Sequence, residues 1–247
     1  KPMAQPAVLV VYTLSAADGG VAQLTAQKVV FGQPSVPAAT GAGFYGVQGG
    51  VIERFDSTGN PQGPVDGSST KGTVFEVRQY DSGLYFTAKV GDCLPTLYSL
   101  PTAGGTPTEV VTADKDYGIV GFDLSADGTK LTYLESSGCN QSRAGMGKLV
   151  FENLTDGSRR AIDFPSEPPA IIGDPVWEAD GAHVDAYVRT GMQGYLARYD
   201  STKGNSATPS SNPCGEYDPA TQLTGALDTD ADGTLWFAGQ TGESMQV

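Results

Sequence analysis

Hydrophobic and polar residues alternate with a period of two over many short segments of the chain. Alternation of this kind predicts half-buried β-strands, whereas apolar residues recurring every 3.6 positions would predict amphipathic helices. No pattern with the helical period is sustained over ten residues anywhere in the sequence. The chain is therefore predicted to be all-β.

One hairpin pattern recurs along the chain: an apolar strand, a turn that contains Asp and Gly, and a second apolar strand. An Asp-Gly turn between alternating strands is a strong hairpin signal, because glycine adopts the positive φ angles that tight turns require. We name the two strands of this hairpin A and B. Its copies are VRQYDSGLYFTAKV (77–90), FDLSADGTKLTYLE (122–135), VWEADGAHVDAYVR (176–189) and LDTDADGTLWFAG (227–239).

A second hairpin pattern, with strands named C and D, lies between the copies of the first. Its copies are IERFDSTGN (52–60), TLYSLPTAGG (96–105), LVFENLTDGS (149–158) and YLARYDSTKGN (195–205). Four antiparallel strands in the order A to D form one blade of a β-propeller. The B strands begin near Phe44, Leu84, Leu131, Val184 and Leu235, at spacings of 40, 47, 53 and 51 residues, which predicts five blades.

The two ends of the sequence are predicted to share one blade. Residues 223–240 supply strands A and B, and the sequence reaches Val247 where strand C should begin. Near the other end, VYTLSAADGG (11–20) is similar to a C–D turn but has no A–B hairpin before it. Residues 8–26 are therefore expected to complete the blade of residues 223–240, so that residues 1–247 form a single five-bladed β-propeller without a free sheet edge.

The hairpin SADGTKLTYLE (125–135), together with the C–D turn, resembles the WD40-like repeat of the TolB-type β-propellers, which are exported bacterial proteins. The resemblance extends over most of the chain. The Gly-His and Trp-Asp pairs of eukaryotic WD40 repeats do not occur in the sequence. The resemblance implies a propeller that serves as a platform for binding proteins or small ligands.

Charge and composition narrow the set of partners. The 28 acidic and 15 basic residues give a net charge of −13, which repels phosphate backbones, so nucleic acid is not expected as a partner. The longest strongly apolar stretch, residues 7–14, is shorter than the roughly 20 residues that cross a bilayer, and no direct membrane insertion is expected. A low lysine content and cysteines in polar loops favour an extracytoplasmic protein, either secreted or the ectodomain of an anchored protein whose leader or anchor precedes Lys1.

Sulfur-containing residues gather in the loops that join strands B to C and D to A. These loops are expected at one end of the blades, and they form the predicted binding face with the candidate residues Met3, Asn140, Met146, Met192 and Met245. The methionines fit three hypotheses: packing over the core, an adaptable binding face, or a copper site. The cysteines are Cys93, Cys139 and Cys214, and the pairs Cys93–Cys139 and Cys139–Cys214 are the first and second candidate disulfides.

Candidate metal and catalytic residues are few. Asp228, Asp230 and Asp232 match the first half of a calcium loop, but position 12 is Gly239 where a bidentate carboxylate is needed. The ordinary hairpin turn explains these aspartates as well, so no cofactor is expected and calcium is the alternative. The single histidine, His183, is predicted to be a surface residue, because no nucleophile motif accompanies it.

The sequence favours a non-enzymatic, extracytoplasmic module that binds or senses a protein or a small ligand through the B–C and D–A loop face. The alternative is a carbohydrate-active hydrolase that uses two carboxylates of the central funnel. Acidic residues on predicted A strands are the candidates for that role. They are Glu76, Asp123, Glu178 and Asp228.

Overall fold

The structure of the chain is a computed structural model. It describes residues 43–56, 59–89, 95–113, 117–136, 147–162, 174–186 and 198–202 in full and, outside these ranges, the backbone of the strands given below. Every pairing between these strands is antiparallel, and the described residues contain one short 3₁₀-helix, η1 (Ser68–Lys71), and no α-helix. The predicted all-β class is confirmed. Within the described part of the chain there is no helix with the length and apolar character needed to cross a membrane.

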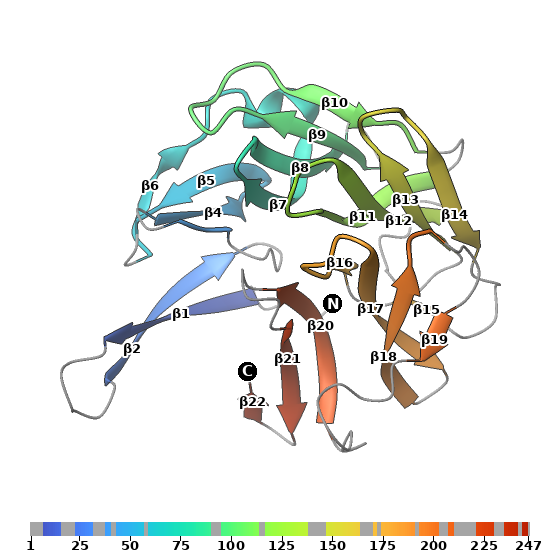
Figure 1. Ribbon diagram of the computed structural model, residues 1–247. Coiled ribbons are helices and arrows are strands. Elements are labelled where there is room, and N and C mark those ends of the chain that lie inside the picture. Colours follow the sequence, from blue (N-terminus) through green and yellow to red (C-terminus); the bar gives the residue numbers. More distant parts are fainter. Residues whose placement is uncertain are drawn as a thin grey trace, which may run out of the picture. The chain divides into compact units, whose positions relative to one another are not determined.

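The chain divides into two compact units, and the first, Lys1–Thr112, contains three sheets (Figure 1). A two-stranded sheet joins β1 (Ala7–Ser15) to β2 (Gln23–Phe31). A four-stranded sheet follows with β3 (Ala38–Thr40), β4 (Gly43–Gln48), β5 (Val51–Phe55) and β6 (Pro61–Pro64). The third sheet has β7 (Thr73–Tyr80), β8 (Gly83–Lys89), β9 (Thr96–Leu100) and β10 (Thr108–Val111).

The second unit, Ala113–Val247, also contains three sheets. The first has β11 (Tyr117–Leu124), β12 (Lys130–Ser137), β13 (Gly147–Asn153) and β14 (Arg159–Asp163). The second has β15 (Ala170–Ile171), β16 (Val176–Trp177), β17 (His183–Thr190), β18 (Gln193–Asp200) and β19 (Ala207–Pro209). The third has β20 (Thr221–Thr229), β21 (Leu235–Thr241) and β22 (Ser244–Gln246).

In four of the six described sheets the strands follow the predicted A-to-D order. The B strands are β4, β8, β12, β17 and β21, and each begins within one residue of the predicted position. The predicted A–B and C–D hairpins pair as expected in the described sheets. The hairpin predicted near the beginning of the sequence is formed by β1 and β2, and the last three strands form a sheet of their own. The number of blades and the closure of a ring by residues 8–26 stay predictions.

The A–B turns owe their shape to one aspartate and one glycine. In the turn between β11 and β12, Asp127 accepts a hydrogen bond of 3.0 Å from the backbone N–H of Thr129, and Gly128 has a φ of 68°. In the turn between β16 and β17, Asp180 takes the same position and Gly181 has a φ of 61°. Hydrogen bonds from Ser125 and from Thr129 lower the pKa of Asp127 to about 2, so its carboxylate stays charged and keeps this role.

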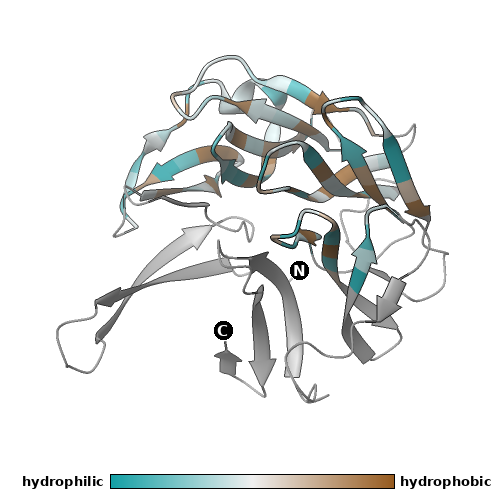
Figure 2. Cartoon of the chain, in the orientation of Figure 1, coloured by the Kyte–Doolittle hydropathy of each residue, from teal (hydrophilic) through white to brown (hydrophobic). Residues whose placement is uncertain are grey.

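A hydrophobic core joins the sheet β11–β14 to the sheet β15–β19. Along the described strands hydrophobic and hydrophilic segments alternate (Figure 2), as expected for strands with two different faces. The buried side chains of this core are Leu134, Leu149, Phe151, Ile162, Trp177, Val184, Ala186 and Tyr199. The first unit has a separate core on the sheets β3–β6 and β7–β10.

The two sheets approach closely at Gly121 on β11. A Cβ at this position would lie 2.4 Å from Oδ1 of Asp174, which precedes β16. A methyl group there would force the Asp174 side chain to move, so glycine leaves room for this carboxylate against β11.

Candidate functional site

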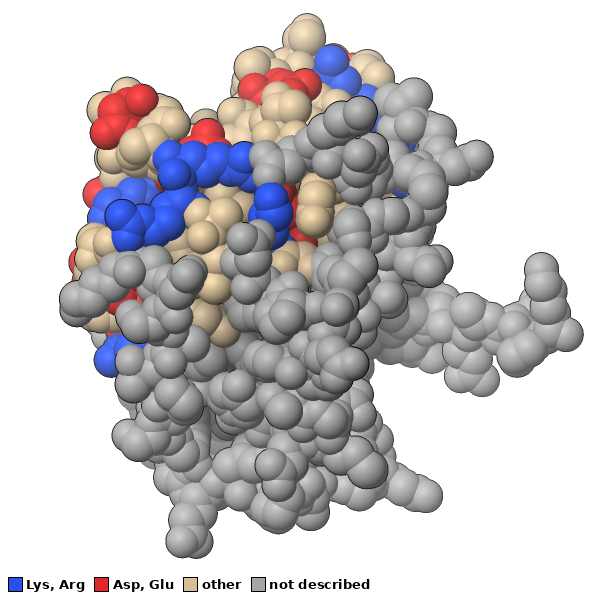
Figure 3. All heavy atoms as spheres, turned by 90° about the vertical axis from the view of Figure 1, so that its right-hand side faces the viewer, with Lys and Arg blue, Asp and Glu red and all other residues tan. Residues whose placement is uncertain are grey.

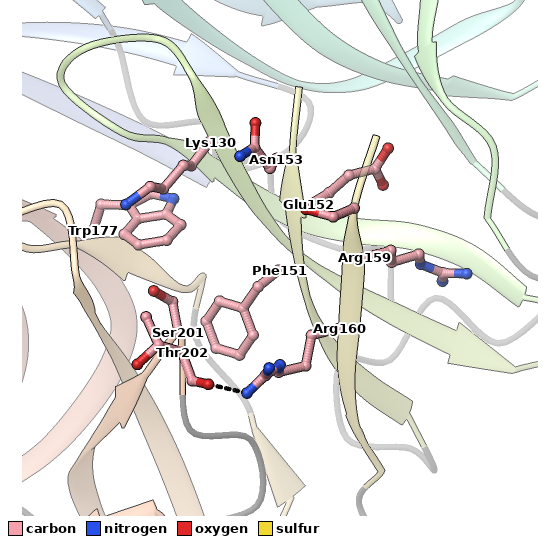
Figure 4. Close-up of a pocket in the computed structure, with 10 residues that line it drawn as sticks. Lys130, Phe151, Glu152, Asn153, Arg159, Arg160, Trp177, Ser201 and Thr202 are labelled. Carbon is pink, nitrogen blue, oxygen red and sulfur yellow. Dashed lines mark hydrogen bonds between the residues drawn. The ribbon is translucent and has the colours of Figure 1, made fainter. Parts of the chain in front are cut away.

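A cavity of about 260 Å³ lies in the second unit, between the sheet β11–β14 and the sheet β15–β19 (Figure 4). It opens at the end of the sheets that carries the A–B and C–D turns. The residues that line it are Lys130, Phe151, Glu152, Asn153, Ser158, Arg159, Arg160, Trp177, Ser201 and Thr202. Phe151 and Trp177 also belong to the core, and their rings, 6.1 Å apart between centroids, form an apolar floor.

The strand register decides which side chains enter the cavity. Lys130 on β12 lies opposite Asn153 on β13, and Phe151 on β13 lies opposite Arg160 on β14. Directly opposed residues of antiparallel strands share a face, and so do residues two positions apart on one strand. The side chains of these four residues therefore share the face that packs against Trp177.

The neighbouring residues Glu152 and Arg159 belong to the opposite face of the same sheet. They lie opposite each other in the register, and in Figure 4 their side chains point away from Phe151. The Tyr133 hydroxyl donates a 3.0 Å hydrogen bond to Glu152, and Arg159 donates one of 2.6 Å to the buried Glu135. Burial raises the pKa of Tyr133, so its hydroxyl keeps the proton that it donates.

Two cations of the inner face reach across to the sheet β15–β19. Nζ of Lys130 donates a hydrogen bond of 2.5 Å to the carbonyl oxygen of Gly181 and lies 5.7 Å from the centroid of the Trp177 ring. The Arg160 guanidinium donates one N–H to the carbonyl oxygen of Thr202 (Figure 4). Each cation thus stands beside the apolar floor, close to the carbonyl that holds it in place.

Hydroxyl and amide groups complete the rim, and the local turns hold them in place. Oδ1 of Asn153 accepts a 2.8 Å hydrogen bond from the N–H of Thr155 in the C–D turn. Oγ1 of Thr202 donates a 2.5 Å hydrogen bond to Asp200, which also accepts from the N–H of Thr202. Ser158 and Ser201 add two further hydroxyls. The arrangement can bind a small molecule that carries both negative charge and polar groups.

Three of the four acids named for the hydrolase alternative are described, and each has a structural contact. Glu76 accepts a hydrogen bond of 3.1 Å from Arg78, and both side chains are buried. Asp123 accepts a hydrogen bond of 2.7 Å from the backbone N–H of Trp177. Glu178 accepts two hydrogen bonds from Arg198. The fourth acid, Asp228, lies on β20, where the structure describes the backbone only.

Another group of polar side chains lies at the turn between β16 and β17. One possible ligand atom from each of Glu178, Asp180 and His183 lies within 4.8 Å of the others. Nδ1 of His183 is 2.5 Å from Asp180, and Arg198 holds Glu178. Partial burial raises the pKa of Asp180, but hydrogen bonds from Ala182 and His183 outweigh it and hold the pKa below the usual value. A cation would have to displace Arg198, so the group is explained as an ion-pair cluster of this turn.

The predicted binding-face, disulfide and calcium residues lie where side chains are not described. Nine of them lie outside the described residues: Met3, Cys93, Cys139, Asn140, Met146, Met192, Cys214, Asp230 and Asp232. For Asp228 on β20 and Met245 on β22 the backbone alone is described. The predictions of the loop face, the disulfide, the copper site and the calcium loop stay predictions.

Sequence reasoning missed Lys130 and Arg160. One signal was present, because Arg159-Arg160 is the one pair of adjacent basic residues in this acidic sequence. The sequence does not say which of the two arginines faces the neighbouring sheet.

Comparison with known proteins shows similarity in structure. No protein-family model matches the chain, and no curated protein matches its sequence. The chain is similar to the putative TolB from Agrobacterium tumefaciens, with a TM-score of 0.65, 16% identity, and coverage of 89% of this chain and 75% of that one. It is similar to TolB from Acinetobacter baumannii, with a TM-score of 0.54, 18% identity, and coverage of 74% and 44%. A chain of a nidogen/laminin complex matches with a TM-score of 0.51, 10% identity, and coverage of 78% and 73%.

Proposed function

We propose, on the premise that the chain has the fold of the TolB-like β-propellers, that it is a binding module whose ligand occupies the cavity between β11–β14 and β15–β19. The observation that carries the proposal is the placement of Lys130 and Arg160 on one face, beside a buried aromatic floor. Concave sites with an apolar floor and a few converging polar groups are the usual form of small-molecule binding sites. One of the similar structures was solved in a nidogen/laminin complex, which supports a role in binding for this fold.

The scaffold supports binding because it holds the walls of the cavity in place. The backbone N–H of Trp177 donates a hydrogen bond to Asp123, and Gly121 leaves room for the Asp174 side chain against β11. Side chains that are already ordered lose little conformational entropy when a ligand arrives. A site of this kind binds without a large rearrangement.

The residues around the cavity suit binding better than catalysis. The lining contains neither histidine nor cysteine, and its carboxylate, Glu152, accepts a hydrogen bond from Tyr133 on the other face of the sheet. A nucleophile of the serine or cysteine type needs an adjacent base. We therefore propose a non-enzymatic role.

The proposal includes an extracytoplasmic location, where the protein would sense or capture its ligand. Support comes from the low lysine content and the cysteines in polar loops. The B–C and D–A loop face is proposed as a second surface, for a protein partner. Fractionation of cells that express the full-length protein tests the location, and recovery with the cytoplasmic fraction would contradict it.

The binding role is tested by blocking the cavity. The variant Thr202→Trp places an indole at the rim, and Thr202 is exposed, so the fold should tolerate it. A panel of small anionic, neutral and cationic compounds is screened by thermal shift against both proteins. A ligand at 100 times its Kd stabilises a folded protein by about 2.7 kcal/mol. At least one compound should raise the Tm of the wild type and fail with T202W; a panel without such a compound would refute the proposal.

A further inference from the structure

The charge around the cavity is opposite to the charge of the protein as a whole. The chain carries 28 acidic and 15 basic residues, yet the charged side chains on the inner face of the cavity are two cations, Lys130 and Arg160, while Glu152 and Arg159 belong to the opposite face of the sheet. Figure 3 views the molecule from the right-hand side of Figure 1, where β14 lies, and shows a band of Lys and Arg side chains on the described surface with Asp and Glu side chains beside it. A group of basic side chains in an otherwise acidic protein indicates a site that binds a negatively charged group.

We propose that this cavity binds a small hydroxylated anion, a carboxylate or a phosphate monoester on a skeleton the size of one sugar ring. The anionic group is bound by Arg160 or Lys130, and the hydroxyl groups of the ligand meet Asn153, Ser158, Ser201 and Thr202. This inference rests on the proposed binding function and names the ligand class of the same site.

The two cations have donors suited to such a group. A guanidinium has five N–H donors in a planar fork that matches a carboxylate or a phosphate. In Arg160 one of these N–H groups donates to the carbonyl oxygen of Thr202. An ammonium group has three N–H donors. In Lys130 one of them donates to the carbonyl oxygen of Gly181. Each cation can keep its bond to the neighbouring sheet while it binds the ligand.

The floor strengthens the attraction and limits the size of the ligand. Phe151 and Trp177 are 5% and 3% exposed, so the base of the cavity lies against a region of low polarity, where charges interact more strongly than in water. The cavity, about 260 Å³, is smaller than the roughly 300–1,000 Å³ of sites for drug-sized molecules. A ligand of one ring with one anionic group fits this space, and the net charge of −13 disfavours polyanions.

A purely structural role for the two cations is the competing explanation. In that case Lys130 and Arg160 would only tie the two sheets together through the carbonyls of Gly181 and Thr202. Arg159 is the matched control, because it is the same residue type on the same strand but donates to Glu135 and lies 5.9 Å from the centroid of the Tyr133 ring on the other face. The variants Arg160→Gln and Arg159→Gln remove the same charge from the protein.

The experiment is calorimetric titration of the full chain with glucuronate, glucose 6-phosphate, inorganic phosphate and neutral glucose. At least one of the two sugar anions should bind at least tenfold more tightly than glucose. R160Q and Lys130→Met should each weaken that binding at least tenfold, and R159Q should change it less than threefold. The Tm of each variant is measured first. If R160Q has a lowered Tm, it is replaced by Arg160→Lys, which keeps the positive charge but lacks the planar fork of N–H donors. This variant should weaken binding less than R160Q does.

Each outcome decides the proposal. Tight binding of glucuronate alone identifies a carboxylate, and tight binding of glucose 6-phosphate alone identifies a phosphate. Equal binding of glucose and both anions, or equal losses in R159Q and R160Q, overturns the ligand class. If both sugar anions fail while another compound binds the wild type and not T202W, the ligand class is wrong and the binding function stands. If nothing binds in either experiment, both proposals fail.

Discussion

The carboxylate of Asp123 on β11 accepts a hydrogen bond of 2.7 Å from the backbone N–H of Trp177 on β16, 54 residues further along the chain. Both residues are buried, and the bond joins two neighbouring sheets at the position where the indole forms the floor of the cavity. A buried hydrogen bond to a charged group contributes more than one between neutral groups, because the charge has few other partners away from water. This contact therefore links the stability of the second unit to the geometry of its site.

The substitution Asp123→Ala should lower the free energy of unfolding by about 2–4 kcal/mol, because it leaves the Trp177 N–H buried without this acceptor. Asp123→Asn keeps an acceptor oxygen of nearly the same shape and should cost less. Urea denaturation followed by tryptophan fluorescence measures both changes. Equal losses in the two variants would show that the negative charge, and not the acceptor, is what matters at this position.

Gly121→Ala should be destabilising, because the new Cβ would lie 2.4 Å from Oδ1 of Asp174. Overpacking of this kind costs roughly 1–3 kcal/mol. The same substitution in an Asp174→Ala background should cost less, because the colliding carboxylate is gone. A double-mutant cycle of unfolding free energies checks the coupling. If the losses of unfolding free energy in the two single variants simply add, the strain does not come from contact with the Asp174 carboxylate.

The stability of the second unit should depend on pH through Asp185. Burial and the nearby Glu178 raise its pKa from 3.8 to about 7, and Arg198 and His183 oppose this shift. Between about pH 4 and pH 7 the folded chain holds a proton that the unfolded chain has lost, so stability from this group falls as the pH rises through that range. Above pH 7 the loss is complete.

Asp185→Asn removes this titration. The variant should be more stable than the wild type at pH 8, by roughly 1–4 kcal/mol, and close to it at pH 4. Urea unfolding at both pH values measures the difference. The same pH dependence in both proteins would assign the effect to another group.

Two glycines with positive φ should respond differently to alanine. Gly181 has a φ of 61° with no atom within 4 Å of an added Cβ, so Gly181→Ala should cost roughly 1–2 kcal/mol, from backbone strain alone. Gly67 has a φ of 81°, and its Cβ would lie 1.8 Å from the carbonyl oxygen of Gly105. Gly67→Ala should therefore cost more than Gly181→Ala in thermal or urea unfolding, and the reverse order would contradict these contacts.

Local pattern was enough to find the strands. The alternation around Leu131 and Val184, with the Asp-Gly turn before each, predicted β12 and β17 to within one residue. Such hairpins are specified by neighbouring residues, because the turn sets the register and the alternation sets the faces. The resemblance to TolB-type propellers rested on the same segments and agrees with the similar structures.

The cavity could not be found in this way, because its parts lie far apart in the sequence. Lys130 and Arg160 share a face only after β12, β13 and β14 have paired, and Trp177 reaches them from the next sheet. Arg159 and Arg160 look alike in the sequence, but the pleat turns one toward Glu135 and the other toward the cavity. The sequence alone therefore determined which segments pair as hairpins, since turn chemistry and alternation act over a few residues. Tertiary structure decided which charges meet, since that depends on how separate sheets pack.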